Sequence, residues 1–185
     1  MDQRLNRIGQ HIVRARLFLD LWFYFEGNET RPAIIDTMRK YNEFFRFTPH
    51  AYLLTYVIYM AGVFDKRKGT ISLLPLIRDV KASGQLGAPE AEIVESLLEQ
   101  ATPIAEKITI LRHNAFAHRS AHISYDDAFA IASVKPEELR NVTDTALEIT
   151  NRLLSARSLQ DQHFTKLPLE AAVSLMKALE ALGSA

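Results

Sequence analysis

The sequence predicts an all-α protein, a single bundle of about six or seven helices. The chain has only seven glycines and seven prolines in 185 residues, and they fall mainly where a helix would begin or end. Between them apolar residues recur at helical spacing, and no segment alternates apolar and polar residues as a half-buried strand does. A chain of this length can bury a core of its own, so we expect one domain over residues 1–185.

The first predicted helix covers residues 2–26. The segment EGNETRP closes it, because Gly27 and Asn28 can adopt the left-handed conformation of a helix C-cap. Thr30 is the expected N-cap of a second helix, which we place over residues 30–46, where apolar residues again have helical spacing.

The third predicted helix covers residues 49–64, with Thr48 as its cap and Pro49 at its first position. It is apolar nearly all round, which places it at the centre of the bundle. It is shorter than the ~20 residues of a membrane-spanning helix, and the apolar run 17–25 is shorter still and contains Asp20. The N-terminus lacks the apolar core of a signal peptide. We therefore expect a cytoplasmic protein that does not enter a membrane.

The later helices follow a charged turn, FDKRKGT. They are expected over residues 71–81, from Pro89 onward, over 136–157 and over 168–182. Pro103 removes one backbone donor from the long helix after Pro89, so that helix should kink or divide in two. Residues 119–135 are expected to form a long connection with one helical turn around DDAFAIA. The helix over 168–182 is the candidate for a peripheral element.

The composition excludes several classes of protein. The hydrophobic fraction is 48%, and 22 basic residues balance 22 acidic ones, as in a globular protein rather than a disordered chain. A formal net charge of zero argues against strong non-specific adhesion to a polyanion, although it leaves a local basic patch open. There is no cysteine, which excludes a disulfide framework and any thiolate metal site.

The segment ILRHNAFAHRSAH, residues 110–122, gathers two arginines and three histidines where the long helix should end. On a helical wheel with ~100° per residue, an apolar stripe forms within about 60° from Ile104, Ile108, Leu111 and Ala115. Arg112 lies on one edge of this stripe and His118 on the other, about 120° apart and ~9 Å along the axis. Ala115 between them is small enough to let a second chain or a phosphate approach.

Other interpretations of these residues stay open. Positive side chains in a last helical turn commonly complement the helix dipole and bond the last carbonyls. His118 and His122 have a metal-ligand spacing, but no second cluster offers the third and fourth ligands, so we expect no metal. Asp126 and Asp127 could form a carboxylate pair, although a helix-start cap explains them better.

Residues Arg112 to His118, RHNAFAH, resemble the signature of the HEPN superfamily, the higher eukaryotes and prokaryotes nucleotide-binding domains. That signature is an arginine, then Asn, Asp or His, and a histidine after four to six intervening residues; five intervene here. Further blocks resemble the abortive-infection, AbiU-like branch of the superfamily: LDLWFYF, AGVFDKRKGTISLLPLI, LRHNAFAHRSAHISYDDAF and KPEELRNVTDTALEITNRLL.

The resemblance implies a helical bundle, often dimeric, and a metal-independent endoribonuclease of phage defence or stress response, without a cofactor. Arg112 and His118 would be its catalytic pair, with His113 and Asn114 in support. The implied partners are RNA, a second copy of the chain and an antitoxin or regulatory protein. Ser120 stands where some related toxins carry a modifiable tyrosine, which argues against regulation by that modification. The alternative is a non-catalytic module of the same fold that binds a nucleotide, RNA or a protein.

Overall fold

The computed structural model describes residues 1–67, 69–113 and 125–182 of the chain. Over these residues the secondary structure is helical, without a strand, which confirms the all-α prediction. The helices are α1 (Asp2–Glu26), α2 (Arg31–Lys40), α3 (Asn42–Phe45), α4 (Thr48–Val63), α5 (Leu73–Ala82), α6 (Ala88–Leu111), α7 (Tyr125–Ala132), α8 (Pro136–Ser155) and α9 (Leu167–Leu182). These nine exceed the predicted number because one predicted helix is divided and the turn around DDAFAIA is a helix of its own.

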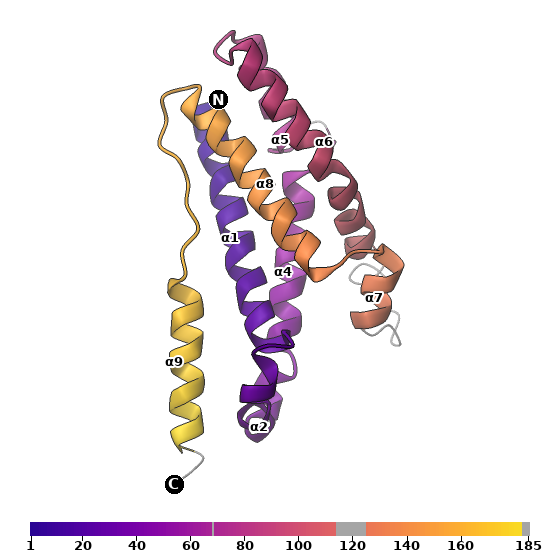
Figure 1. Ribbon diagram of the computed structural model, residues 1–185, viewed down its shortest axis with the longest axis vertical. Helices are drawn as coiled ribbons and strands as arrows, with labels where there is room; N and C mark the ends of the chain where they lie inside the picture. The colour runs from indigo at the N-terminus through magenta and orange to yellow at the C-terminus, as the bar shows by residue number, and fades with distance from the viewer. Residues whose placement is uncertain (68, 114–124, 183–185) are drawn as a thin grey trace.

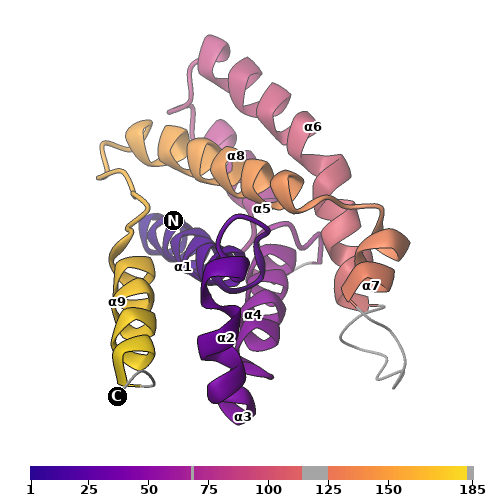
Figure 2. The same ribbon diagram turned by 60° about the horizontal axis from the view of Figure 1, so that its bottom comes forward.

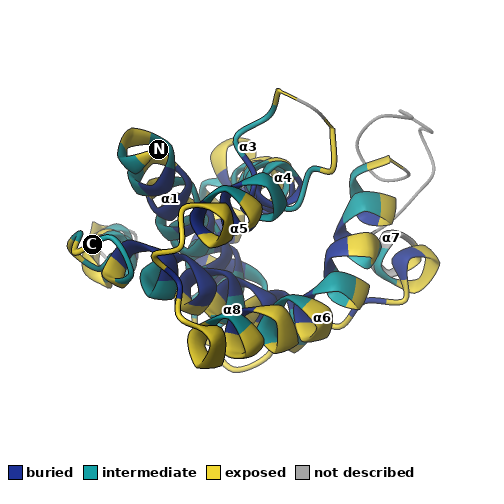
Figure 3. Ribbon diagram, turned by 90° about the horizontal axis from the view of Figure 1, so that it is seen from above, coloured by how far each residue is buried: buried dark blue, intermediate teal, exposed yellow. Residues whose placement is uncertain are grey.

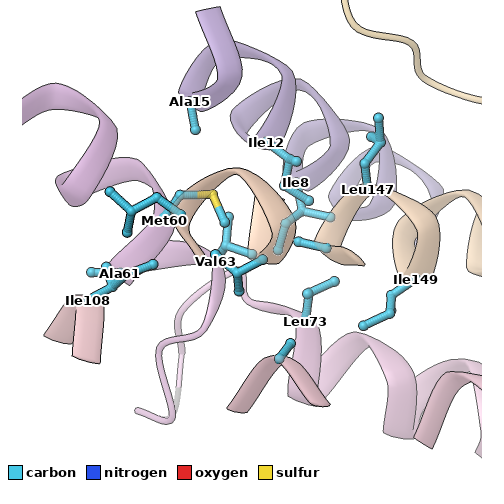
Figure 4. Close-up of a cluster of buried hydrophobic side chains, with 14 of the residues drawn as sticks. Ile8, Ile12, Ala15, Met60, Ala61, Val63, Leu73, Ile108, Leu147 and Ile149 are labelled. Atoms are coloured by element: carbon cyan, nitrogen blue, oxygen red, sulfur yellow. The ribbon is translucent and has the colours of Figure 1, made fainter. Parts of the chain in front are cut away.

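The core lies among α1, α4, α6 and α8 (Figure 1). Helix α1 packs mainly on α4 and α8, and α6 packs mainly on α8. The buried side chains of the four helices meet between them, among them Ile12 of α1, Met60 of α4, Ile108 of α6 and Ile149 of α8 (Figure 4). Helix α4 packs on α1 and α6, but its Ile58 is 56% exposed, so one face of this apolar helix is open and the predicted enclosed central position is only partly correct. Seen along the bundle, exposed residues occupy mainly the outward faces of the helices (Figure 3).

The junction between α1 and α2 differs from its prediction. Gly27 is extended, with φ −68° and ψ 139°, so it is not a left-handed cap. It is nevertheless confined, since a Cβ there would lie 2.3 Å from the Phe23 carbonyl oxygen. The Thr30 hydroxyl donates to the carbonyls of Tyr24 (2.6 Å) and Phe23 (3.1 Å), so this threonine closes α1 and makes no side-chain cap on α2.

The predicted helix over residues 30–46 is divided at Tyr41, whose φ of −113° and ψ of 42° leave the helical region. The prediction of Thr48 as a cap was also wrong. Thr48 is the first residue of α4, after Phe47, and its hydroxyl donates to the Phe44 carbonyl at 2.7 Å. Helix α6 runs through Pro103 as one element, so the expected division there does not occur.

Helices α7 and α9 lie on opposite sides of the molecule (Figure 2). Helix α7 packs on α6, and its Phe129 stacks on Trp22 of α1 with the ring centroids 5.7 Å apart. Helix α9 follows a non-helical segment and packs on α1 and α2 through Met176. No described helix is both long enough and apolar enough to cross a lipid bilayer.

Candidate functional site

Arg112 is held in place by the last turns of α6. Ile108 and Leu111 are buried in the core, as the apolar stripe predicts, and they fix the rotation of the helix just before Arg112. The backbone of Arg112 is still helical, and its N–H is directed at the carbonyls of Ile108 and Thr109. Arg112 and His113 then form a π-helical turn. Such widened turns occur often at functional sites, and this one brings Arg112 half-buried to the edge of the core.

The guanidinium of Arg112 has no carboxylate within 4.0 Å among the described residues. Its one described side-chain contact is a long one, 3.4 Å from Nη2 to Nε2 of the exposed His113. Most other half-buried arginines are paired, for example Arg16 with Asp20 at 2.9 Å and Arg4 with Asp79 at 2.9 Å. Arg112 therefore keeps a positive charge that no anion among the described residues neutralises by direct contact.

Arg112 borders a cavity of about 780 Å³ between α6 and the connection that leads from α4 to α5. The apolar part of its lining includes Phe64, Leu74 and Leu98. The hydroxyl groups of Thr102 and Thr109 also line it. A cavity of this size, mainly apolar with a few polar groups, is typical of small-molecule and cofactor sites.

The charged residues around this cavity are mostly paired with each other. Arg67 donates to both carboxylate oxygens of Asp65, with its Nη2 2.6 Å from Oδ2. Lys66 pairs with Glu106 of α6 at 3.2 Å. The hydrogen bonds from Arg67 are the main cause that lowers the pKa of the Asp65 carboxyl, and the charge of Arg112 lowers it least. The charges within each of these two ion pairs cancel, so Arg112 leaves the described lining of the cavity with a net positive charge.

The other predicted site residues are placed only in part. Asn114, Ala115, His118, Ser120 and His122 lie outside the described residues, so the pairing of Arg112 with His118 stays a prediction. Helix α6 ends before that segment and α7 begins after it, and the two helices pack together. Among the described residues, no three histidine, aspartate or glutamate side chains are grouped as metal ligands.

Asp65, Lys66 and Arg67 were predicted only as part of a charged turn, not as residues of the site. Three consecutive charges after an apolar helix are a common surface pattern and predict no contact. They line the cavity because the connection meets α6, where Lys66 pairs with Glu106, 40 residues away in the sequence. A contact at that separation has no periodic signal that a single sequence could show.

The chain matches a known protein family. A protein-family model, HEPN_AbiU2, described as AbiU2, matches residues 1–167. The match covers every helix from α1 to α8 and ends where α9 begins. Neither the curated proteins nor the solved structures contain a significant match.

Proposed function

The chain belongs to the AbiU2 family of HEPN domains, and on that premise we propose that it is a metal-independent endoribonuclease of phage defence or stress response. The family points to a role that involves nucleotides or RNA. Within that role, the proposed substrate is RNA and the proposed reaction is its cleavage. The proposed setting is abortive infection, in the cytoplasm. The observation that carries it is Arg112, a cation without a direct carboxylate partner among the described residues, at the first position of the RHNAFAH motif and beside a cavity.

Arg112 and His118 have complementary roles in the proposed reaction. His118 accepts the proton of a ribose 2′-hydroxyl, since an imidazole titrates near neutral pH. The 2′-oxygen then attacks the adjacent phosphorus, and the bond from phosphorus to the 5′-oxygen breaks. Arg112 offers a planar fork of donors to the phosphate oxygens as their charge develops. The proton that His118 took up is returned to the leaving 5′-oxygen, and the products are a 2′,3′-cyclic phosphate and a 5′-hydroxyl.

The proposal includes a second copy of the chain. A twofold axis near Arg112 would bring two copies of the motif into one cleft, as the resemblance implies. Two exposed apolar residues support an interface at this end: Ile110 of α6, 41% exposed, and Ile131 of α7, 50% exposed. An antitoxin or another regulatory protein could use the same surface to control access to RNA.

The second candidate function is a HEPN module that binds a nucleotide, RNA or a protein without cleaving it. The cavity beside Arg112 favours it, because binding there needs only the arginine and the cavity lining. In this version Arg112 holds a phosphate and His118 has no catalytic role.

RNA cleavage in the presence of EDTA tests the proposal. The parent protein and the His118→Ala variant are each incubated with a mixed-sequence RNA and with DNA of the same sequence. We expect the parent to cleave RNA to products with cyclic phosphate ends, the variant to be inactive, and the DNA to stay intact because it has no 2′-hydroxyl. Equal cleavage by both proteins would contradict the role of His118. Cleavage by neither folded protein would favour the binding module.

A further inference from the structure

We propose that the cavity between α6 and the α4–α5 connection binds one nucleotide of the RNA, with the base in its apolar part and a phosphate on Arg112. This inference extends the proposed function, on which it rests, by giving the site a pocket for a nucleoside next to the phosphate that is cut. It uses only described residues, and the motif histidine is not needed for the binding itself.

The size and lining of the cavity suit a nucleotide. Its volume of about 780 Å³ lies within the range of ~300–1,000 Å³ that is usual for small-molecule pockets. Phe64 is a half-buried aromatic residue of the lining, and base–aromatic stacking tolerates any base. Leu74 and Leu98 supply further apolar surface.

Two hydroxyl groups of the lining can meet the polar edge of a base. Thr102 donates to the Leu98 carbonyl at 2.7 Å and Thr109 donates to the Ala105 carbonyl at 3.0 Å. Each hydroxyl proton is used within the helix, so the lone pairs of the oxygen are available as acceptors. They are suited to the amino and imino donors of a nucleobase.

The charges around the cavity favour an anionic ligand. Asp65 is paired with Arg67 and Glu106 with Lys66, so neither carboxylate opposes an incoming phosphate with a full charge. Arg112 lacks a carboxylate contact among the described residues and can present two donors to one phosphate. An apolar side chain of a protein partner would fill the cavity but would leave this charge unused.

The arrangement predicts a division of the binding energy between two parts of the ligand. The phosphate should depend on Arg112, and the base should depend on the cavity. AMP should therefore bind at least about tenfold more tightly than ribose 5-phosphate, which has the phosphate and the sugar but no base to stack. AMP should also inhibit RNA cleavage by competition, because its phosphate occupies Arg112.

Thr109→Phe blocks the cavity from a half-buried helical position, and Thr145→Phe is its matched control. Thr145 is also half-buried in a helix, and its hydroxyl makes the same kind of bond, to the Asn141 carbonyl at 2.9 Å, but it does not line the cavity. Calorimetric titration of the full chain with AMP and with ribose 5-phosphate measures both affinities. We expect Thr109→Phe to weaken AMP binding by about tenfold or more and Thr145→Phe to leave it unchanged.

Arg112→Gln provides a second variant in case Thr109→Phe folds poorly. It should weaken AMP and ribose 5-phosphate by the same factor, because both ligands lose the phosphate contact. The inference is overturned if AMP binds the parent no more tightly than ribose 5-phosphate, or if a folded Thr109→Phe variant binds AMP like the parent. RNA cleavage measured on the same samples separates the two proposals: cleavage without AMP binding overturns only the pocket, and AMP binding without cleavage overturns only the nuclease.

Discussion

The body of α6 and the residue that follows its last turn, Arg112, lie in surroundings of different character. Along most of its length the helix packs into a core where Ile108, Leu139 and Ile149 are fully buried and where buried polar groups are hydrogen-bonded, except Trp22 Nε1 and Ser72 Oγ, which have no partner among the described residues. The hydroxyl of Tyr56, for example, donates to the Leu139 carbonyl at 2.8 Å. After Leu111 the same helix presents Arg112, half-buried and without a carboxylate contact among the described residues. Stability and the proposed chemistry therefore depend on different residues of one helix, and they should be separable by mutation.

Arg112→Ala should give the largest effect, and only on activity. Loss of the donors that stabilise the developing charge should reduce RNA cleavage by at least ~100-fold. The free energy of unfolding should change by less than about 0.5 kcal/mol, because no ion pair with a described residue is lost. Cleavage rates and urea melts measure the two quantities. Arg4→Ala, which removes the ion pair with Asp79 far from the site, is the control and should cleave like the parent.

A substitution in the core should show the opposite pattern. Ile149→Ala removes a fully buried side chain of the central cluster and should cost ~2–5 kcal/mol of unfolding free energy. Cleavage per folded molecule should stay at the parental rate. Ile58→Ala is the matched control, since Ile58 is 56% exposed and should lose little stability. An inactive but folded Ile149→Ala protein would show that the site depends on core packing after all.

Tyr56→Phe tests how much a buried hydrogen bond contributes to the stability of the core. The side chain is 0% exposed, and burial raises the pKa of its hydroxyl, which stays protonated and bonded to Leu139 and Thr143. Removal of the hydroxyl should cost about 1 kcal/mol, the net contribution of one hydrogen bond. Tyr59→Phe is the comparison, because no described residue bonds the Tyr59 hydroxyl. Equal losses from both variants would mean that the buried hydrogen bonds contribute nothing specific.

The sequence predicts the extents of the helices better than the hydrogen bonds at their ends. The extents of α1, α4 and α8 follow from helical spacing and from proline positions, so they were found within a few residues. The roles of Thr30 and Thr48 were not, because each hydroxyl bonds the carbonyls of the helix that precedes it rather than the one that follows. A threonine one or two residues before a proline is consistent with either arrangement. Local sequence therefore predicts where one helix ends and the next begins, but it does not predict which hydrogen bonds form there.

The candidate site was predictable only through its motif. Arg112 was identified from the motif, and its half-buried position agrees with the edge of the apolar stripe. The cavity was not predictable, because it requires the α4–α5 connection to meet α6 through Lys66 and Glu106. Packing between distant segments decides which charges cancel, and that information is absent from the spacing of residues along one helix.

Substitution of His11, which lies in the core-forming helix α1, should change stability the least of these variants. Burial lowers the pKa of its imidazole below the ordinary 6.5, and the charges of Arg14 and Arg7 lower it further. The unfolded chain then binds the proton more tightly than the folded one, so stability is lost as the pH falls through 6.5. The melting temperature should fall between about pH 7.5 and pH 5.5, and His11→Gln should reduce that fall by about 1 °C.

Arg14→Gln tests the cause of this effect, because removal of one cation should raise the pKa of His11 and reduce the same loss of stability. Neither variant should move the pH profile of RNA cleavage, which the proposed mechanism assigns to His118. A shift of that profile in His11→Gln would mean that the titrations of the two regions are coupled. Unchanged profiles with altered melting curves would show that His11 contributes to stability and does not set the pH profile of the reaction.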